Sequence, residues 1–174
     1  FKHIPLGAKT ETQSVAASSD TTLLAVAQGG TIRLHDLTGT TIRDMSIKGG
    51  KPLDLLFSPD RSTLAATLGN TVLFIDTVEA SIRGRATLTT TAGGGSEPLT
   101  LHRFSRDGHR LVAGNGEKRY ALFDTDTGKP VSLTQLADPD QERGGPSPPD
   151  LAVVDISDDG EYLIRQSAQL GTVQ

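Results

Sequence analysis

Cysteine and tryptophan are both absent from the 174 residues, and aromatic side chains make up only 4% of them. Without cysteine the chain forms no disulfide and offers no thiolate to a metal ion. The same absence fits a reducing cytosol and a cysteine-poor secreted protein alike. It therefore leaves the compartment open, and we favour the cytoplasm over a periplasmic or secreted location.

Long hydrophobic runs and concentrated positive charge are also missing. No apolar run approaches the roughly 20 residues that a membrane-spanning helix needs, and residues 1–10 lack the charged-then-apolar order of a signal peptide. The net charge of -4 is spread along the chain, so no basic stripe is offered to a phosphate backbone. We expect neither a membrane-spanning segment nor a nucleic acid as the main partner.

A short turn motif is present and recurs four times. It consists of a serine, one variable residue and an aspartate, and its serines are Ser18, Ser58, Ser105 and Ser157, spaced 40, 47 and 52 residues apart. Aspartate favours tight turns by bonding nearby backbone, and the glycine or proline in three of the motifs favours them by backbone geometry. Self-similarity at such a period is typical of repeat folds.

Apolar residues stand at fixed distances from each serine. A leucine lies six residues after it (Leu24, Leu64, Leu111, Leu163), and Ala17, Phe57, Phe104 or Ile156 lies one residue before it. Further on, residues 31–36, 71–76 and 119–124 alternate with the period of a strand and end in aspartate. A second turn and a looser fourth strand follow. The pattern predicts units of four antiparallel strands.

This order of strands and turns resembles the WD-repeat β-propeller family over about residues 13–174. The family's Trp-Asp pair is replaced here by His35-Asp36, Ile75-Asp76 and Phe123-Asp124. A related propeller type, the YVTN or Tol-associated class, is the alternative. The resemblance implies an all-β fold in which each unit is one propeller blade.

Five segments follow from the repeat. We expect a lead-in or outer strand of a preceding blade in 1–12, blade 1 in 13–50, blade 2 in 51–96, blade 3 in 97–148 with a long loop at 137–149, and an incomplete blade 4 in 149–174. Residues 171–174 match 30–33, so the pattern stops inside a third strand.

We expect the chain to form about three and a half blades, as part of a propeller ring of six to eight blades. Further chain, a second polypeptide or a second copy would supply the rest, and two copies would sum to seven blades, so a homodimeric ring is an alternative.

Two connections between blades are long enough to form a binding surface, residues 91–97 and 137–149. The resemblance places both on the rim that also carries the turns between second and third strands, a rim that this family uses for binding. The charged Asp138, Asp140, Glu142 and Arg143 make the second loop our tentative contact site, with a solvated loop as the alternative.

Two patterns that resemble chemical sites are rejected. The glycines at 93–95 are not followed by the Lys-Ser or Lys-Thr of a phosphate-binding loop. Residues 124–128 begin like a calcium loop, but Thr134 stands where the bidentate glutamate belongs, so a hairpin turn is favoured. We expect no metal ion and no cofactor.

The remaining candidates are isolated side chains. His102 shares a column with Val15, Leu55 and Val154 and is therefore predicted to be buried; His35 takes the tryptophan position and should pack between blades, and His109 belongs to a turn. Arg103 and Asp155 interrupt an apolar first-strand column, where they are solvated, paired across blades or involved in ligand binding. No Gly-x-Ser-x-Gly motif is present, so no catalytic residue is predicted.

These observations favour a non-enzymatic propeller, acting as a protein-protein interaction scaffold or as the sensor domain of a larger multidomain protein. Its partner would be another protein or the remainder of its own propeller. The alternatives are the propeller portion of an extracytoplasmic enzyme, of the prolyl-oligopeptidase-like hydrolase or lactonase type, and a structural cell-surface repeat. Fold class alone does not decide among them.

Overall fold

The structure is a computed structural model that describes residues 11–88, 98–115, 119–131, 151–160 and 162–167. All regular elements in these ranges are strands, and none is a helix that could span a membrane. The strands of each sheet are antiparallel and follow one another in chain order. The first sheet contains β1 (Thr12–Ala17), β2 (Leu23–Gln28), β3 (Thr31–Asp36) and β4 (Thr41–Ser46).

Two further four-stranded sheets and one two-stranded sheet complete the described fold. The second sheet contains β5 (Leu55–Phe57), β6 (Thr63–Leu68), β7 (Thr71–Asp76) and β8 (Ser81–Thr87). The third contains β9 (Thr100–Phe104), β10 (Arg110–Asn115), β11 (Arg119–Asp124) and β12 (Lys129–Pro130). The fourth pairs β13 (Leu151–Ile156) with β14 (Leu163–Ser167).

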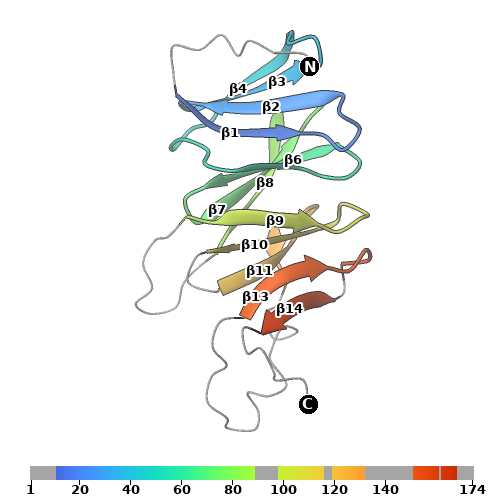
Figure 1. Cartoon of the computed structure of the whole chain (residues 1–174). Helices are drawn as coiled ribbons and strands as arrows, with labels where there is room; N and C mark the ends of the chain where they lie inside the picture. Colours follow the sequence, from blue (N-terminus) through green and yellow to red (C-terminus); the bar gives the residue numbers. More distant parts are fainter. Residues whose placement is uncertain (1–10, 89–97, 116–118, 132–150, 161, 168–174) are drawn as a thin grey trace, which may run out of the picture.

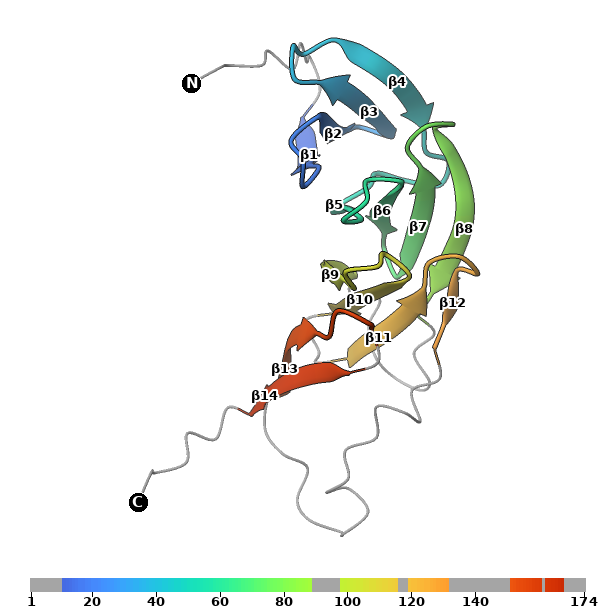
Figure 2. The ribbon, with the colours of Figure 1, turned by 90° about the vertical axis from the view of Figure 1, so that its right-hand side faces the viewer.

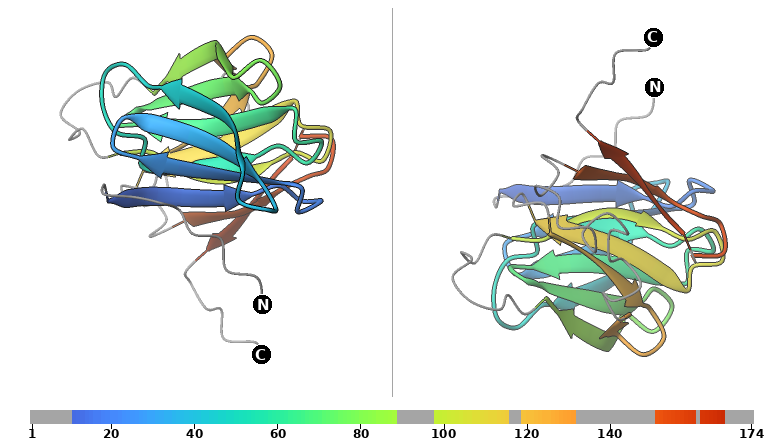
Figure 3. Two further views of the ribbon diagram at one scale, coloured as in Figure 1. Left: turned by 90° about the horizontal axis from the view of Figure 1, so that it is seen from above. Right: turned by 90° about the horizontal axis from the view of Figure 1, so that it is seen from below.

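The sheets follow one another like the blades of a propeller. In Figure 1 they lie one above the next, and the views from above and below in Figure 3 show them stacked face over face. Figure 2 shows that the stack curves into an arc. The first strands β1, β5, β9 and β13 lie on its concave side, and β4, β8 and β12 lie on its convex side. The predicted all-β propeller of four-stranded antiparallel blades is confirmed.

The four Ser-x-Asp motifs form one kind of turn, as the sequence predicts. In each, the serine Oγ donates to the aspartate Oδ1, at 2.7 Å in Ser18, 2.6 Å in Ser58, 2.6 Å in Ser105 and 2.5 Å in Ser157. The same Oγ accepts the backbone N–H five residues further on, at 2.8–3.0 Å. Each hydroxyl therefore joins the two ends of its turn.

The residue that follows the aspartate adopts a left-handed backbone. Gly108 and Gly160 have φ of 79° and 73°, while Thr21 and Arg61 occupy the same place with φ of 56° and 58°. Glycine has no Cβ to clash in this region, whereas other residues adopt it at a cost. The first two turns are thus held by their hydrogen bonds in a conformation that their sequence does not favour.

Apolar side chains fill the space between neighbouring sheets. Leu34 and Leu64 belong to the cluster between the first two sheets, and Phe74 and Leu111 belong to the cluster between the second and third. Each of these four side chains is almost fully buried. Leu64 and Leu111 confirm the aligned leucine column, while Leu24 is only partly buried on the other face of the first sheet. Burial of apolar area between the sheets stabilises their stacking.

The prediction that His102 is buried is wrong. A β-bulge between β9 and β10 shifts the register, because Val112 pairs with Arg103 while Ala113 pairs with Leu101. The bulge inserts His102 as an extra residue, so Leu101 takes the place that Leu55 has in the second sheet. Leu101 is 8% exposed, whereas His102 is exposed.

Candidate functional site

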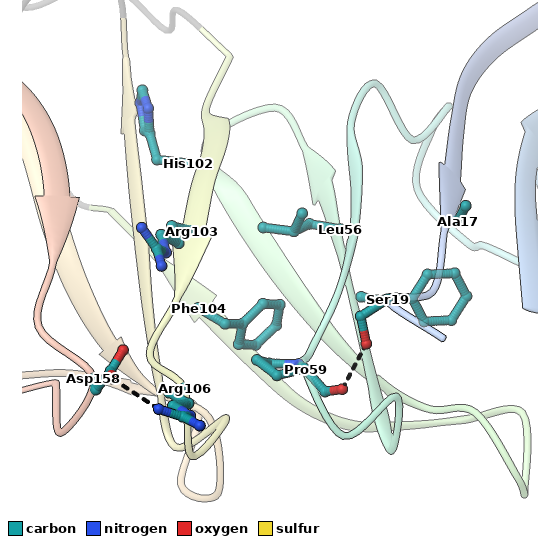
Figure 4. A pocket seen from close by; sticks show the side chains of 10 residues that line it. Ala17, Ser19, Leu56, Pro59, His102, Arg103, Phe104, Arg106 and Asp158 are labelled. Carbon is teal, nitrogen blue, oxygen red and sulfur yellow. Dashed lines mark hydrogen bonds and ion pairs between the residues drawn. The ribbon is translucent and has the colours of Figure 1, made fainter. Parts of the chain in front are cut away.

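A hollow of about 570 Å³ lies on the concave side of the arc. It is bounded by the first strands of three sheets and by the Ser-x-Asp turns, as Figure 4 shows. Its lining combines apolar, cationic and polar side chains: Ala17, Ser19, Leu56, Phe57, Pro59, His102, Arg103, Phe104, Arg106 and Asp158.

The apolar part of the lining comes from the last residues of β5 and β9. Phe57 and Phe104 each precede a turn serine and are 6% and 4% exposed, so they anchor the wall of the hollow in the cores between sheets. Leu56 is partly buried, and Pro59 is exposed beside it. Fixed apolar walls of this kind let a pocket bind the apolar part of a ligand.

Two arginines supply the cationic part. Arg103 extends from β9 at the position that Leu56 occupies in β5, and it is exposed. Arg106 is the variable residue of the third Ser-x-Asp turn; its Nη1 lies 3.3 Å from Asp158 Oδ2, and its backbone N–H donates to the Asp158 carbonyl at 3.1 Å. The Arg106 side chain is 80% exposed, so most of its donors face solvent.

His102 contributes an imidazole ring to the hollow. Although the residue as a whole is exposed, partial desolvation of its ring lowers the pKa of His102 below its ordinary value of 6.5, and the nearby Asp54 carboxylate opposes this shift only in part. The imidazole also contacts the ring of Tyr120, with centroids 5.2 Å apart. Asp54 Oδ2 itself accepts the Leu101 backbone N–H at 2.8 Å, which ties the second sheet to the bulge of the third.

Contacts between consecutive turns hold the edge of the hollow. Ser19 Oγ donates to the Pro59 carbonyl at 2.9 Å, and Arg61 Nη1 lies 2.6 Å from Asp20 Oδ2. Together with the contacts between Arg106 and Asp158, these bonds link the first turn to the second and the third to the fourth. The four turns are therefore joined in two pairs along the edge.

The tentative contact residues Asp138, Asp140, Glu142 and Arg143, and the whole of loop 91–97, lie outside the described residues. The hollow is at the other rim, where the first-to-second strand turns lie. The use of this loop as a contact site therefore stays a prediction.

The other isolated candidates have structural contacts. His35 is 6% exposed, and its Nδ1 lies 3.2 Å from Thr41 Oγ1 of its own sheet. Its packing between blades stays a prediction. His109 is in a turn as predicted, with Nδ1 2.8 Å from Asp126 Oδ2. Asp124 Oδ1 accepts the Thr127 backbone N–H at 2.8 Å, as a hairpin turn requires. Among the residues that the structure describes, no group of three or more potential ligands could hold a metal ion.

Sequence reasoning missed the residues that edge the hollow, although a signal was present. Each is the variable residue of a Ser-x-Asp motif: Ser19, Pro59, Arg106 and Asp158. The conspicuous repeated serines and aspartates point into their own turns, and the residue between them points toward the concave side. A pattern that identifies a repeat by its constant residues overlooks the variable one.

Comparison with known proteins gives matches in structure only. No family model matches the chain, and no curated protein matches it. A chain from a crystal structure of the mitotic checkpoint complex aligns with a TM-score of 0.59 and 21% identity, over 71% of this chain and 36% of that one. The WD40 repeats of RRP9 align with a TM-score of 0.61 and 15% identity, over 72% of this chain and 39% of that one.

The fold is thus that of part of a WD40-type β-propeller, which confirms the resemblance seen in the repeat. At identities of 21% and 15% the similarity concerns the fold alone. This chain spans well under half the length of either solved chain. No role follows from the fold alone.

Proposed function

We propose that the chain is the propeller portion of a protein-interaction scaffold within a larger protein, and that it presents its concave hollow to another protein. The hollow carries this proposal, because its edge is formed by turns that are bonded internally and to one another. A preformed surface orders few residues on binding, so little conformational entropy is lost.

The side chains of the turns support binding rather than hydrolysis. The hydroxyls of Ser18, Ser58 and Ser105 each donate to an aspartate of their own turn. A serine nucleophile instead needs a base that accepts its proton, commonly a histidine. These serines therefore have a turn-holding role, and the alternative of a propeller-borne hydrolase gains no support from them.

A site-specific photo-crosslinker tests the proposal. Introduced at Ser19, on the edge of the hollow, it should link the protein to a discrete partner in extract of the source cells. A crosslinker at Thr87, exposed on the outer strand β8, is the matched control. Partner peptides identified by mass spectrometry should come from the Ser19 position and not from Thr87.

Two outcomes would contradict the proposal. Equal labelling from both positions would indicate nonspecific contact, and a lack of crosslinks at Ser19 would show that the hollow is not an interface. The loop with Asp138, Asp140, Glu142 and Arg143 stays a separate prediction. Deleting residues 138–149 should weaken capture of a partner that uses that rim.

A further inference from the structure

The first sheet lies at one end of the stack, and no other sheet packs on its far side in the described part of the chain, as Figure 1 shows. Ala25, Ala27 and Leu34 point to the second sheet, where they belong to the shared core cluster. Side chains alternate along a strand, so the residues between them point to the far side. We call this side the end face; its residues are Val15, Ala17, Leu24, Val26, Arg33 and His35.

The end face corresponds to a covered face in each of the next two sheets. The pairing registers show that Val15 on β1 takes the position of Leu55 on β5 and Leu101 on β9. Leu55 and Leu101 are 5% and 8% exposed, because each lies in the core that joins its sheet to the preceding one. Val15 is 48% exposed.

Two neighbouring positions show the same difference. Phe57 and Phe104 are buried, whereas Ala17 at the same place in the first sheet is exposed. Leu64 is 0% exposed, whereas Leu24 at its place is only partly buried. Ala17 pairs directly with Leu24, and Val15 lies two residues away on the same side of β1. The three side chains therefore form one apolar patch.

The β3 part of the end face is polar and already paired. Arg33 stands where the second sheet has Leu73. Its Nη1 donates to Gln28 Oε1 at 2.8 Å, and its Nε lies 3.4 Å from Asp44 Oδ2. Both partners belong to the same sheet, so this part of the face needs no outside group to satisfy its hydrogen bonds. The apolar patch is the part that gains free energy from being covered.

The faces that cover such a patch elsewhere in the chain are alike. Ala25 of the first sheet and Ala65 of the second occupy the same place on their second strands, and both are fully buried against the following sheet. A small side chain there lets the larger residues of the following sheet pack closely. A sheet with a face of this kind fits on the patch of the first sheet.

We propose that a further four-stranded sheet, from another part of the same polypeptide, packs on the end face and covers Val15, Ala17 and Leu24. This inference rests on the proposed function, in which the chain belongs to a larger protein, and it identifies the surface that joins the chain to the rest. Two observations select this occupant. The same positions are covered by a preceding sheet twice within this chain, and the solved WD40-type chains extend well beyond the aligned part.

Cysteine accessibility in the intact source protein tests the proposal, since the 174 residues contain no cysteine of their own. A maleimide should react about tenfold more slowly with Val15→Cys than with Val78→Cys, because the covering sheet excludes the reagent. Val78, 67% exposed in the turn before β8, is the matched control. Mass spectrometry of the peptide that carries the substitution measures the reaction, and in urea both cysteines should react equally.

A photo-crosslinker in place of Val15 identifies the occupant. It should link to a peptide of the same polypeptide outside residues 1–174, and the product should show no added chain on a denaturing gel. A link to residues 1–10, to a second copy or to a different protein would overturn the proposal, as would equal reaction of Val15→Cys and Val78→Cys in the native protein.

The two proposals fail in different ways. A partner captured from Ser19 together with a freely reactive Val15→Cys would leave the scaffold function standing and overturn this inference alone. A protected Val15→Cys without any crosslink from Ser19 would support the inter-sheet contact and contradict binding in the hollow.

Discussion

Ser58 Oγ donates to Asp60 Oδ1 at 2.6 Å and accepts the backbone N–H of Thr63 at 3.0 Å, so one hydroxyl joins β5 to β6. Ser58 is 1% exposed and Thr63 is buried with it. This pair of bonds recurs in the other three turns, and it makes the serine a structural residue of every blade.

Ser58→Ala should therefore destabilise the protein by about 2 kcal/mol, because the buried Thr63 N–H is left without its acceptor. Urea unfolding followed by circular dichroism measures the change. Ser157→Ala is the control, since the bond from Tyr162 to Ser157 is exposed and water can replace it. The control should lose less stability, and an equal loss in both variants would contradict the burial argument.

Thr21→Gly should stabilise the protein by about 0.5–1 kcal/mol. Thr21 has φ of 56° where Gly108 and Gly160 stand in the third and fourth turns. Relief of the left-handed strain outweighs the extra chain entropy that glycine brings to the unfolded state. Thermal unfolding should show a higher midpoint. The reverse change, Gly108→Ala, should lower it, and a shift of the same sign in both would disprove this account.

Gly128 connects the outer turn of the third sheet to the outer strand of the second. A Cβ added at Gly128, whose φ is 65°, would lie 3.2 Å from the Arg85 backbone N. Gly128→Ala should therefore destabilise by about 2–3 kcal/mol through strain and close contact together. Gly29→Ala isolates the strain, because Gly29 has φ of 61° with nothing within 4 Å of an added Cβ.

The difference between the two unfolding free energies measures the contact between blades. Equal values for Gly128→Ala and Gly29→Ala would show that the approach of Gly128 to β8 contributes nothing to stability.

Acid should weaken the turns over a narrow range of pH. Hydrogen bonds, first from the Ser18 hydroxyl and then from Thr22, lower the pKa of Asp20 from 3.8 to about 2, and a hydrogen bond from Ser105 is the largest cause of the lowered pKa of Asp107. A carboxyl with a lower pKa in the folded state contributes stability above its unfolded pKa and loses it as the pH falls through the folded value.

The contribution of these two carboxylates to stability should be constant from neutral pH down to about 4 and should be lost between pH 4 and 2. We therefore expect the urea midpoint to fall over that lower range. Asp107→Asn, which cannot ionise, should reduce this fall. An identical pH profile for the variant and the wild type would show that Asp107 does not contribute to it.

The turns could be predicted from the sequence because their hydrogen bonds are local. Ser105, Asp107 and Arg110 lie within six residues of each other, so residue type and spacing fix the geometry that the structure shows. The burial of Leu64 and Leu111 was predictable for a related reason, since strand alternation places them on one face.

His102 could not be placed in this way, because one bulged residue reverses the alternation without any mark in the sequence. The hollow was equally hidden, since Leu56 and Pro59 of the second sheet approach Arg106 of the third only when the two sheets stack.

The sequence by itself thus determined the blade, its strands and its turns, whose interactions join residues close together in the chain. Only the tertiary structure decided the concave hollow, the placement of Arg103 beside Leu56 and the exposure of His102. The exposure of His102 depends on the register of pairing between β9 and β10. The hollow depends on packing between blades, which brings together residues far apart in the chain, such as Leu56 and Arg103.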